Sequence, residues 1–153
     1  MSVGRNRYGS MLAPEEAERR LQQQGARLTA PRRAVLRVLA GNRSHPSAEE
    51  IADQVRAKLG CVAPATVYNT LETLEKLGFV RRIEGLEARS HFDPDTSAHE
   101  HAICTKCRRV WDVAAVSPPR DLPEGFRVSD LLIQGVCKYC ARPGAEAVDD
   151  SAK

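Results

Sequence analysis

Two histidines and two cysteines lie within nine consecutive residues, 99–107, which have the sequence HEHAICTKC. A second pair of cysteines with the same spacing follows at Cys137 and Cys140. Thiolates are soft metal ligands and imidazoles are harder ones, so these residues could serve one metal ion or two. The choice between one site and two largely decides what class of protein this is.

The paired cysteines predict a structural zinc site. Each Cys-x-x-Cys pair places two sulfur atoms around one turn, and two such turns complete a tetrahedron around Zn(II). Four thiolates leave no open coordination position, so the ion would stabilise the fold rather than take part in a reaction. Iron or an Fe–S cluster could use the same ligands, and unrelated redox or buried thiols are the alternative without metal. The four predicted zinc ligands are Cys104, Cys107, Cys137 and Cys140.

If the four thiolates fill the zinc site, His99 and His101 must have a different role. Alternate residues of an extended segment point to the same side, so the two imidazoles can share an ion. Three of the four histidines in the chain lie between residues 91 and 101, which argues against chance placement on the surface. The nearby oxygen donors are Asp93, Asp95, Glu100 and Asp112. Imidazole and carboxylate without sulfur suit Fe(II) or Mn(II), so the sequence predicts a second, separate metal site.

The residues before these sites predict a helical region with clear boundaries. Helices are expected over residues 14–24, 29–40, 47–59 and 64–77. Ser47 and Glu50 form a capping-box pattern at the start of the third helix, and Gly78 ends the fourth. Residues 79–92 predict a two-stranded hairpin, with 84–87 as its connection. Helices followed by a small hairpin indicate a winged helix-turn-helix, in which the last helix enters a DNA major groove.

The second half predicts a different, smaller domain. Strands are expected at 110–113 and 128–136, and the three prolines within 116–125 leave little room for a full helix between them. We expect a winged-helix DNA-binding domain at 1–93, with 1–12 as a flexible tail. A metal-binding domain follows at 94–142, and residues 143–153 form a second flexible tail.

Composition and charge limit the function. The chain has 153 residues, of which 42% are hydrophobic and 28% charged, typical of a soluble globular protein. It has no apolar run long enough to span a membrane and no pattern of a signal peptide, so we expect it in the cytoplasm with no membrane partner. The net charge is only +3, but residues 27–43 hold five arginines and no acid. This stripe suits DNA phosphates or a solvated helix face, and by itself it does not distinguish them.

Six motifs make the sequence resemble the ferric uptake regulator (Fur) family of metal-sensing repressors. They occur in family order across nearly the whole chain: GARLTAPR (25–32), HPSAEE (45–50), PATVYNTL (64–71), SHFD (90–93), HEHAICTKC (99–107) and GVCKYC (135–140). The resemblance implies an α+β homodimer with an N-terminal winged helix-turn-helix and a small C-terminal α/β dimerisation domain. It also implies structural Zn(II) on the four cysteines. The protein would be a repressor of palindromic operator DNA rather than an enzyme, with no small organic substrate.

Within that family the sequence looks most similar to the peroxide-sensing (PerR) branch. Asp112 stands where iron-responsive members usually have glutamate, and Asn69 stands where they usually have arginine. The branch implies a regulatory Fe(II) or Mn(II) ion bound by His45, Asp93, His99, His101 and Asp112. Peroxide would then oxidise a ligand imidazole, at His45 or His99, and release the operator. A sensor of iron, manganese or zinc supply is the alternative within the family, and a small metalloenzyme is the alternative outside it.

The predicted DNA contacts come from the fourth helix and the arginine stripe. Tyr68 and Asn69 are the expected base readers, with Thr66 near the helix start. Arg27 and Arg32 would contact the backbone or the minor groove. The alternative for Tyr68 is packing against the wing.

Two features depart from the family pattern. His91 stands where the family often has arginine, and it could be an additional metal ligand or only a polar neighbour of Asp93. The stretch between Asp112 and Cys137 is short and interrupted by proline, so the helix of the dimerisation domain is expected to be shortened. This stretch also lacks the histidine that relatives use for a further metal site, which favours a single regulatory ion. Cys61 is left without a role.

Overall fold

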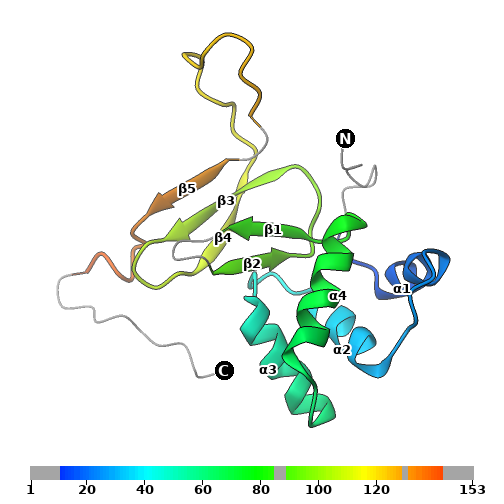
Figure 1. The fold of residues 1–153 in the computed structure, drawn as a ribbon. Coiled ribbons are helices and arrows are strands. Elements are labelled where there is room, and N and C mark those ends of the chain that lie inside the picture. Colours follow the sequence, from blue (N-terminus) through cyan, green and yellow to red (C-terminus); the bar gives the residue numbers. More distant parts are fainter. Residues whose placement is uncertain (1–10, 85–88, 129–130, 143–153) are drawn as a thin grey trace. The chain divides into compact units, whose positions relative to one another are not determined.

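The computed structural model describes residues 11–84, 89–128 and 131–142. The chain divides into two compact units, Met1–Ser97 and Ala98–Lys153. In the described residues, the first unit contains four helices and a two-stranded sheet, and the second contains a three-stranded sheet (Figure 1). None of the helices in this part of the chain is long and apolar enough to cross a lipid bilayer.

The four helices agree with the predicted ranges to within one residue at each end. They are α1 (Pro14–Gln23), α2 (Ala30–Leu39), α3 (Ala48–Leu59) and α4 (Pro64–Lys76). The α3 capping box is formed as predicted: the Glu50 amide donates to Ser47 Oγ at 3.2 Å, and the Ser47 amide donates to the Glu50 carboxylate at 2.6 Å. These two bonds satisfy amides that would otherwise lack partners, so they fix where α3 begins.

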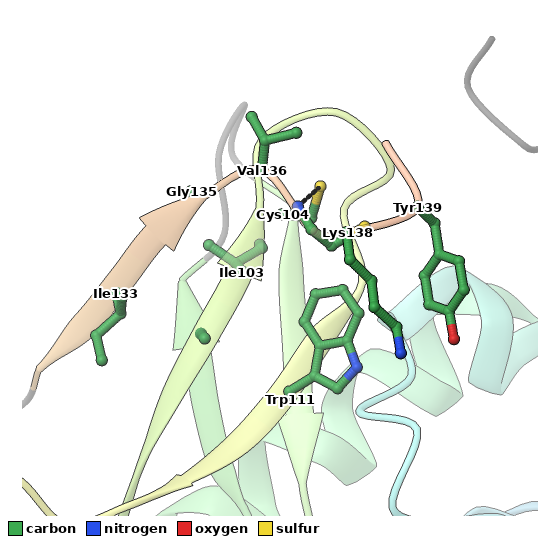
Figure 2. Close-up of a pocket in the computed structure, with 10 residues that line it drawn as sticks. Ile103, Cys104, Trp111, Ile133, Gly135, Val136, Lys138 and Tyr139 are labelled. Atoms are coloured by element: carbon green, nitrogen blue, oxygen red, sulfur yellow. Dashed lines mark hydrogen bonds between the residues drawn. The ribbon is translucent and has the colours of Figure 1, made fainter. Parts of the chain in front are cut away.

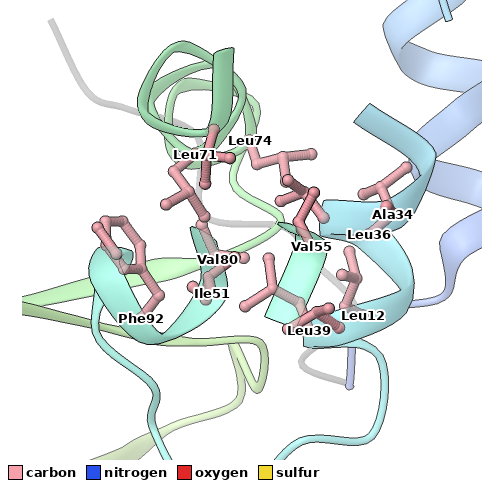
Figure 3. Close-up of a cluster of buried hydrophobic side chains, with 14 of the residues drawn as sticks. Leu12, Ala34, Leu36, Leu39, Ile51, Val55, Leu71, Leu74, Val80 and Phe92 are labelled. Carbon is pink, nitrogen blue, oxygen red and sulfur yellow. The ribbon is translucent and has the colours of Figure 1, made fainter. Parts of the chain in front are cut away.

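The apolar faces of the helices meet in one core (Figure 3). The fully buried side chains of this core include Leu21, Leu36, Leu39, Ile51, Val55, Leu71, Leu74 and Phe92. Burying a side chain of this size contributes about 1.5–3 kcal/mol relative to leaving it in water. Since Val67, Leu71 and Leu74 face this core, α4 is held with its opposite face toward solvent.

The wing is an antiparallel pair of strands that begins directly after α4. Gly78 adopts a φ of +74°, which a side chain would disfavour, and the Phe79 amide then donates to the Leu74 carbonyl at 2.9 Å. β1 (Arg81–Glu84) pairs with β2 (Ser90–Asp93). Glu84, predicted to begin the connection at 84–87, belongs to β1 instead, and residues 85–88 lie outside the described residues. Both strands begin two residues later than predicted. In β1 this is because Phe79 is part of the turn that closes α4 and packs in the core.

The second unit is a mixed sheet with the strand order β4-β3-β5. β3 (His99–Cys104) pairs with β4 (Val110–Ala114) in antiparallel fashion and with β5 (Leu132–Gly135) in parallel fashion. Of the predicted strand at 128–136, Val128, Leu131 and Val136 lie outside β5, and residues 129–130 are not described. β5 ends at Gly135 because its partner β3 ends at Cys104, where the turn to Cys107 begins. Residues 115–128 and Leu131 contain no helix, in agreement with the three prolines of this connection.

Candidate metal centres

The four paired cysteines lie together in the second unit. Cys104 is the last residue of β3, and Gly135, its partner in the parallel ladder, comes two residues before Cys137. This pairing brings the two Cys-x-x-Cys turns together, and the four sulfur atoms lie within 4.8 Å of one another. Cys107 Sγ and Cys137 Sγ are 3.8 Å apart. A tetrahedron with Zn–S bonds of about 2.3 Å has edges of about 3.8 Å, so these donors fit a closed zinc site.

Backbone hydrogen bonds shape the first cysteine turn. The Arg108 amide donates to the Cys104 carbonyl at 2.9 Å, and the Cys104 amide donates to the Arg109 carbonyl at 3.0 Å. Arg108 takes a left-handed φ of +64°, which lets β4 turn back along β3. The Cys137 amide points at Cys104 Sγ from 3.4 Å (Figure 2). An N–H directed at sulfur stabilises the thiolate, which is the form that binds metal.

The four thiols differ in how easily they ionise. Burial opposes ionisation of Cys104, but the amides of Cys137, Cys107 and Lys106 outweigh it and lower the pKa of Cys104 from 9.0 to about 6. Burial and the neighbouring thiols raise the pKa of Cys140 to about 12. Burial also raises the pKa of Cys107, whereas the Cys140 amide lowers the pKa of Cys137. Without a cation, the raised pKa of Cys140 keeps its thiol protonated at neutral pH, and a bound cation would favour the thiolate form.

A second, sulfur-free set of donors lies on the other side of the same sheet. His99 and His101 project from one face of β3, and Asp112 on β4 is the ladder partner of His101. His99 Nε2 lies 3.1 Å from His101 Nε2 and 3.3 Å from Asp112 Oδ1. Ligands about 2.1 Å from an ion and at right angles are roughly 3 Å apart, so these distances suit two imidazoles and a carboxylate on one metal. Of these three residues, His101 is almost completely buried and Asp112 is exposed.

The first unit holds the other two residues of the predicted regulatory set. His45 precedes α3 and Asp93 ends β2, and both are buried to about 98%. His45 Nε2 lies 3.9 Å from Asp93 Oδ1. Asp93 Oδ1 also accepts the Asp95 amide at 2.8 Å, which fixes the carboxylate. The strand β2 and the segment before α3 therefore bring together two residues that are 48 positions apart in the sequence.

The structure separates the remaining candidate oxygen donors from these sets. Glu100 lies between the two histidines in β3 and so points to the opposite face of the sheet. Asp95 accepts the Ser97 amide at 2.9 Å and closes a local turn. His91 is buried, and its Nδ1 lies 2.7 Å from the His45 carbonyl oxygen. No sequence pattern predicts this last contact, because it joins two segments that only the fold brings together.

The residues predicted to contact DNA lie on the exposed side of the first unit. Tyr68 is 46% exposed and Asn69 is exposed, on the face of α4 that points away from the core. Thr66 is half-buried in the first turn of α4. Arg27 is exposed beside α2, where its carbonyl accepts a hydrogen bond from the Arg32 guanidinium. The direct role of these five residues at DNA stays a prediction.

The fold and the sites together define a winged-helix protein that carries two kinds of metal-ligand cluster. The model of the ferric uptake regulator family matches residues 23–118. The peroxide operon regulator of Bacillus subtilis is 36% identical over 137 residues, which span 84% of this chain and 93% of that protein. Among solved structures, the Helicobacter pylori ferric uptake regulator has a TM-score of 0.71 at 21% identity, covering 88% of this chain and 99% of that one. A zinc-bound manganese uptake regulator has a TM-score of 0.60 at 27% identity, covering 78% and 97%.

This chain belongs to the ferric uptake regulator family. The expected family and the winged-helix fold class are confirmed, and the Bacillus relative agrees with the expected peroxide-sensing branch. The chain is a metal-dependent transcriptional regulator and not an enzyme, so the small metalloenzyme is excluded.

Proposed function

We propose that this protein is a repressor that binds operator DNA when a regulatory Fe(II) or Mn(II) ion is present and releases it after peroxide reacts with the Fe(II) form. The observation that carries the proposal is the sulfur-free convergence of His99, His101 and Asp112, on a sheet whose four cysteines form a separate cluster. Zn(II) on the four cysteines would be structural, and the imidazoles and carboxylates would hold the ion that regulates.

The regulatory ligands are divided between the two units. His45 and Asp93 belong to the first unit, whereas His99, His101 and Asp112 belong to the second. Either set alone offers two or three protein ligands, which is an incomplete shell for Fe(II) or Mn(II). An ion held by all five residues would favour the arrangement in which both sets face it. Such an ion shifts the equilibrium only by its differential affinity for that arrangement.

A palindromic operator calls for two copies of the winged helix. The outer edge of β5 has no strand partner among the described residues. On one face of the same sheet, Trp111 of β4, Ile133 of β5, Val136 and Tyr139 are each 37–51% exposed around a shallow pocket of about 320 Å³ (Figure 2). Exposed apolar side chains beside an open strand edge suit pairing with a second copy of this chain. The homodimer would present two α4 helices to DNA in the cytoplasm.

The peroxide response would occur at the imidazoles that bind the ion. Bound Fe(II) supplies a reducing centre for peroxide next to its ligands, which Mn(II) does not. A ligand imidazole carbon at His45 or His99 would gain one oxygen atom, while the peroxide is reduced to water. The modified ring is a poorer ligand, so the regulatory ion would be lost and the DNA-binding arrangement would no longer be favoured.

The test is peptide mass spectrometry after mild peroxide treatment of the Fe(II) form, with the Mn(II) form as control. We expect an added mass of one oxygen on a peptide containing His45 or His99, only in the Fe(II) sample and together with loss of operator binding. Oxidation confined to cysteine in both samples would instead identify a thiol sensor.

A sensor of metal supply is the second candidate, and the similarity to a manganese uptake regulator favours it. The two candidates share the same ligands, since imidazole and carboxylate do not separate Fe(II) from Mn(II). They differ in the response to peroxide. If the Fe(II) form still binds its operator after peroxide treatment and its histidines carry no added oxygen, the protein is a sensor of metal supply.

A further inference from the structure

His45 has an unusual backbone conformation for a residue with a side chain. Its φ is +52°, in the left-handed region that L-residues rarely adopt, and the residue is 2% exposed. Such a conformation persists only where the surrounding structure imposes it, and it is often found where a side chain must point in one direction. The contacts around the His45 main chain therefore show what holds its imidazole in place.

The strand β2 makes these contacts. His91 Nδ1 lies 2.7 Å from the His45 carbonyl oxygen, and the Phe92 amide donates to the Pro46 carbonyl at 3.0 Å. Ser47 and His91 also form an antiparallel bridge. Residues 45–47 thus lie along β2 as a short extra strand segment, immediately before the capping box that begins α3.

The hydrogen bond assigns the proton on His91. A carbonyl oxygen can only accept, so His91 Nδ1 must donate. Because His91 is buried, the bond is shielded from competing water. Two residues further along the same strand, Asp93 points to the same side as His91. One strand therefore carries one predicted ligand, Asp93, and fixes the main chain of another, His45.

We propose that His91 is a positioning residue for the regulatory metal site. Its Nδ1–H group holds the His45 carbonyl, and with it the left-handed turn that sets the His45 imidazole 3.9 Å from Asp93. The part of this inference that concerns metal affinity rests on the proposed function. The part that concerns the His45 main chain does not, because it can be measured without metal.

The matched variants are His91→Asn and His91→Leu. The asparagine side-chain amide offers an N–H group at nearly the place of His91 Nδ1, whereas leucine fills similar space without a donor. If His91 positions His45, His91→Asn keeps the Mn(II) affinity within about threefold of the wild type, and His91→Leu weakens it roughly ten- to a hundredfold. Arg89→Leu, at an exposed residue beside β2, is the control and should leave the affinity unchanged.

Two outcomes would overturn the proposal. If His91→Asn weakens Mn(II) binding as much as His91→Leu, the imidazole itself is required and His91 acts as a ligand. If His91→Leu binds Mn(II) like the wild type, the bond to His45 does not position the site. Zinc content and circular dichroism establish that each variant is folded.

A measurement on the metal-free wild type covers the case in which His91→Leu does not fold. Long-range ¹H–¹⁵N spectra should show His91 as the Nδ1–H tautomer, and the Nε2–H tautomer would refute the assigned bond. Where His91→Leu does fold, the amides of His45 and Ser47 should exchange faster in it than in His91→Asn. If the wild type binds no Mn(II) while these signatures are present, the proposed function fails and the positioning of His45 stands.

Discussion

The Nε2 atoms of His99 and His101 lie 3.1 Å apart on β3, beside the carboxylate of Asp112. These two imidazole nitrogens and one carboxylate oxygen are close enough to bind a single metal ion. We expect His99→Ala to remove Mn(II)-dependent DNA binding, with at least a tenfold loss of Mn(II) affinity. Metal titration followed by fluorescence anisotropy of labelled operator DNA measures both.

The control for this prediction lies in the same strand. Glu100→Ala removes a carboxylate that points to the opposite face of β3, so it should keep the metal dependence of the wild type. Both variants should keep one zinc ion per chain. The assignment of the regulatory site is wrong if His99→Ala binds its operator with unchanged dependence on Mn(II).

The cysteine cluster predicts a separate effect on folding. Cys137→Ser should lose Zn(II) and lower the unfolding temperature of the second unit, because a three-thiolate site binds at least about a hundredfold more weakly. Cys61→Ser changes an exposed cysteine outside the cluster and should keep the zinc. Zinc is measured by mass spectrometry of metals and unfolding by calorimetry. Equal zinc content in the two variants would contradict a four-cysteine site.

Zinc affinity should depend on pH in a direction set by the thiol pKa values. In the metal-free protein Cys140, with a pKa of about 12, is protonated at neutral pH and must release its proton when zinc binds. Affinity should therefore rise at least tenfold for each pH unit between about pH 7 and 9. Below the Cys104 pKa of about 6, a further thiolate becomes protonated and the loss of affinity should become steeper. Competition with a chelator of known affinity tests this, and a flat profile from pH 7 to 9 would refute it.

Asn69 and Arg32 should affect DNA binding in different ways. Asn69→Ala removes a predicted base contact, so discrimination between the operator and altered sequences should fall by about 1–3 kcal/mol. Arg32→Gln removes a predicted phosphate contact, so the protein should bind all DNA sequences more weakly. The slope of log binding constant against log salt concentration should become shallower by about one. Binding isotherms at several salt concentrations separate the two effects. Equal losses on every sequence for Asn69→Ala would rule out base reading by this residue.

The open edge of β5 predicts how the chain dimerises. Ile133→Asp places a charge among the exposed apolar side chains beside that edge and should convert the dimer to monomers. Gln134→Glu adds the same charge on the opposite face of the same strand and should leave the dimer intact. Light scattering measures the mass of each. A dimer that survives Ile133→Asp would place the interface elsewhere.

The sequence by itself determined the elements and the kinds of ligand. Apolar spacing in α4, the Ser47–Glu50 capping box and the glycine after α4 are local signals, so the helix ends were predicted closely. The thiolate site and the imidazole–carboxylate site could be predicted as two separate sites, because residue type and local spacing decide which metal each set of ligands prefers. The three prolines of 116–125 likewise predicted that a full helix would not fit there, and the described residues of this connection contain none.

The tertiary structure decided what depends on contacts between distant segments. The parallel pairing of β5 with β3 joins two cysteine pairs that are 30 residues apart, and the pairing of β4 with β3 places Asp112, rather than Glu100, beside the histidines. The hydrogen bond from His91 to the His45 carbonyl spans 46 positions and follows from no local pattern. Ladder register and backbone strain arise only when the chain has folded back on itself. For that reason spacing and composition predict which residues can bind a metal, but not how they are held.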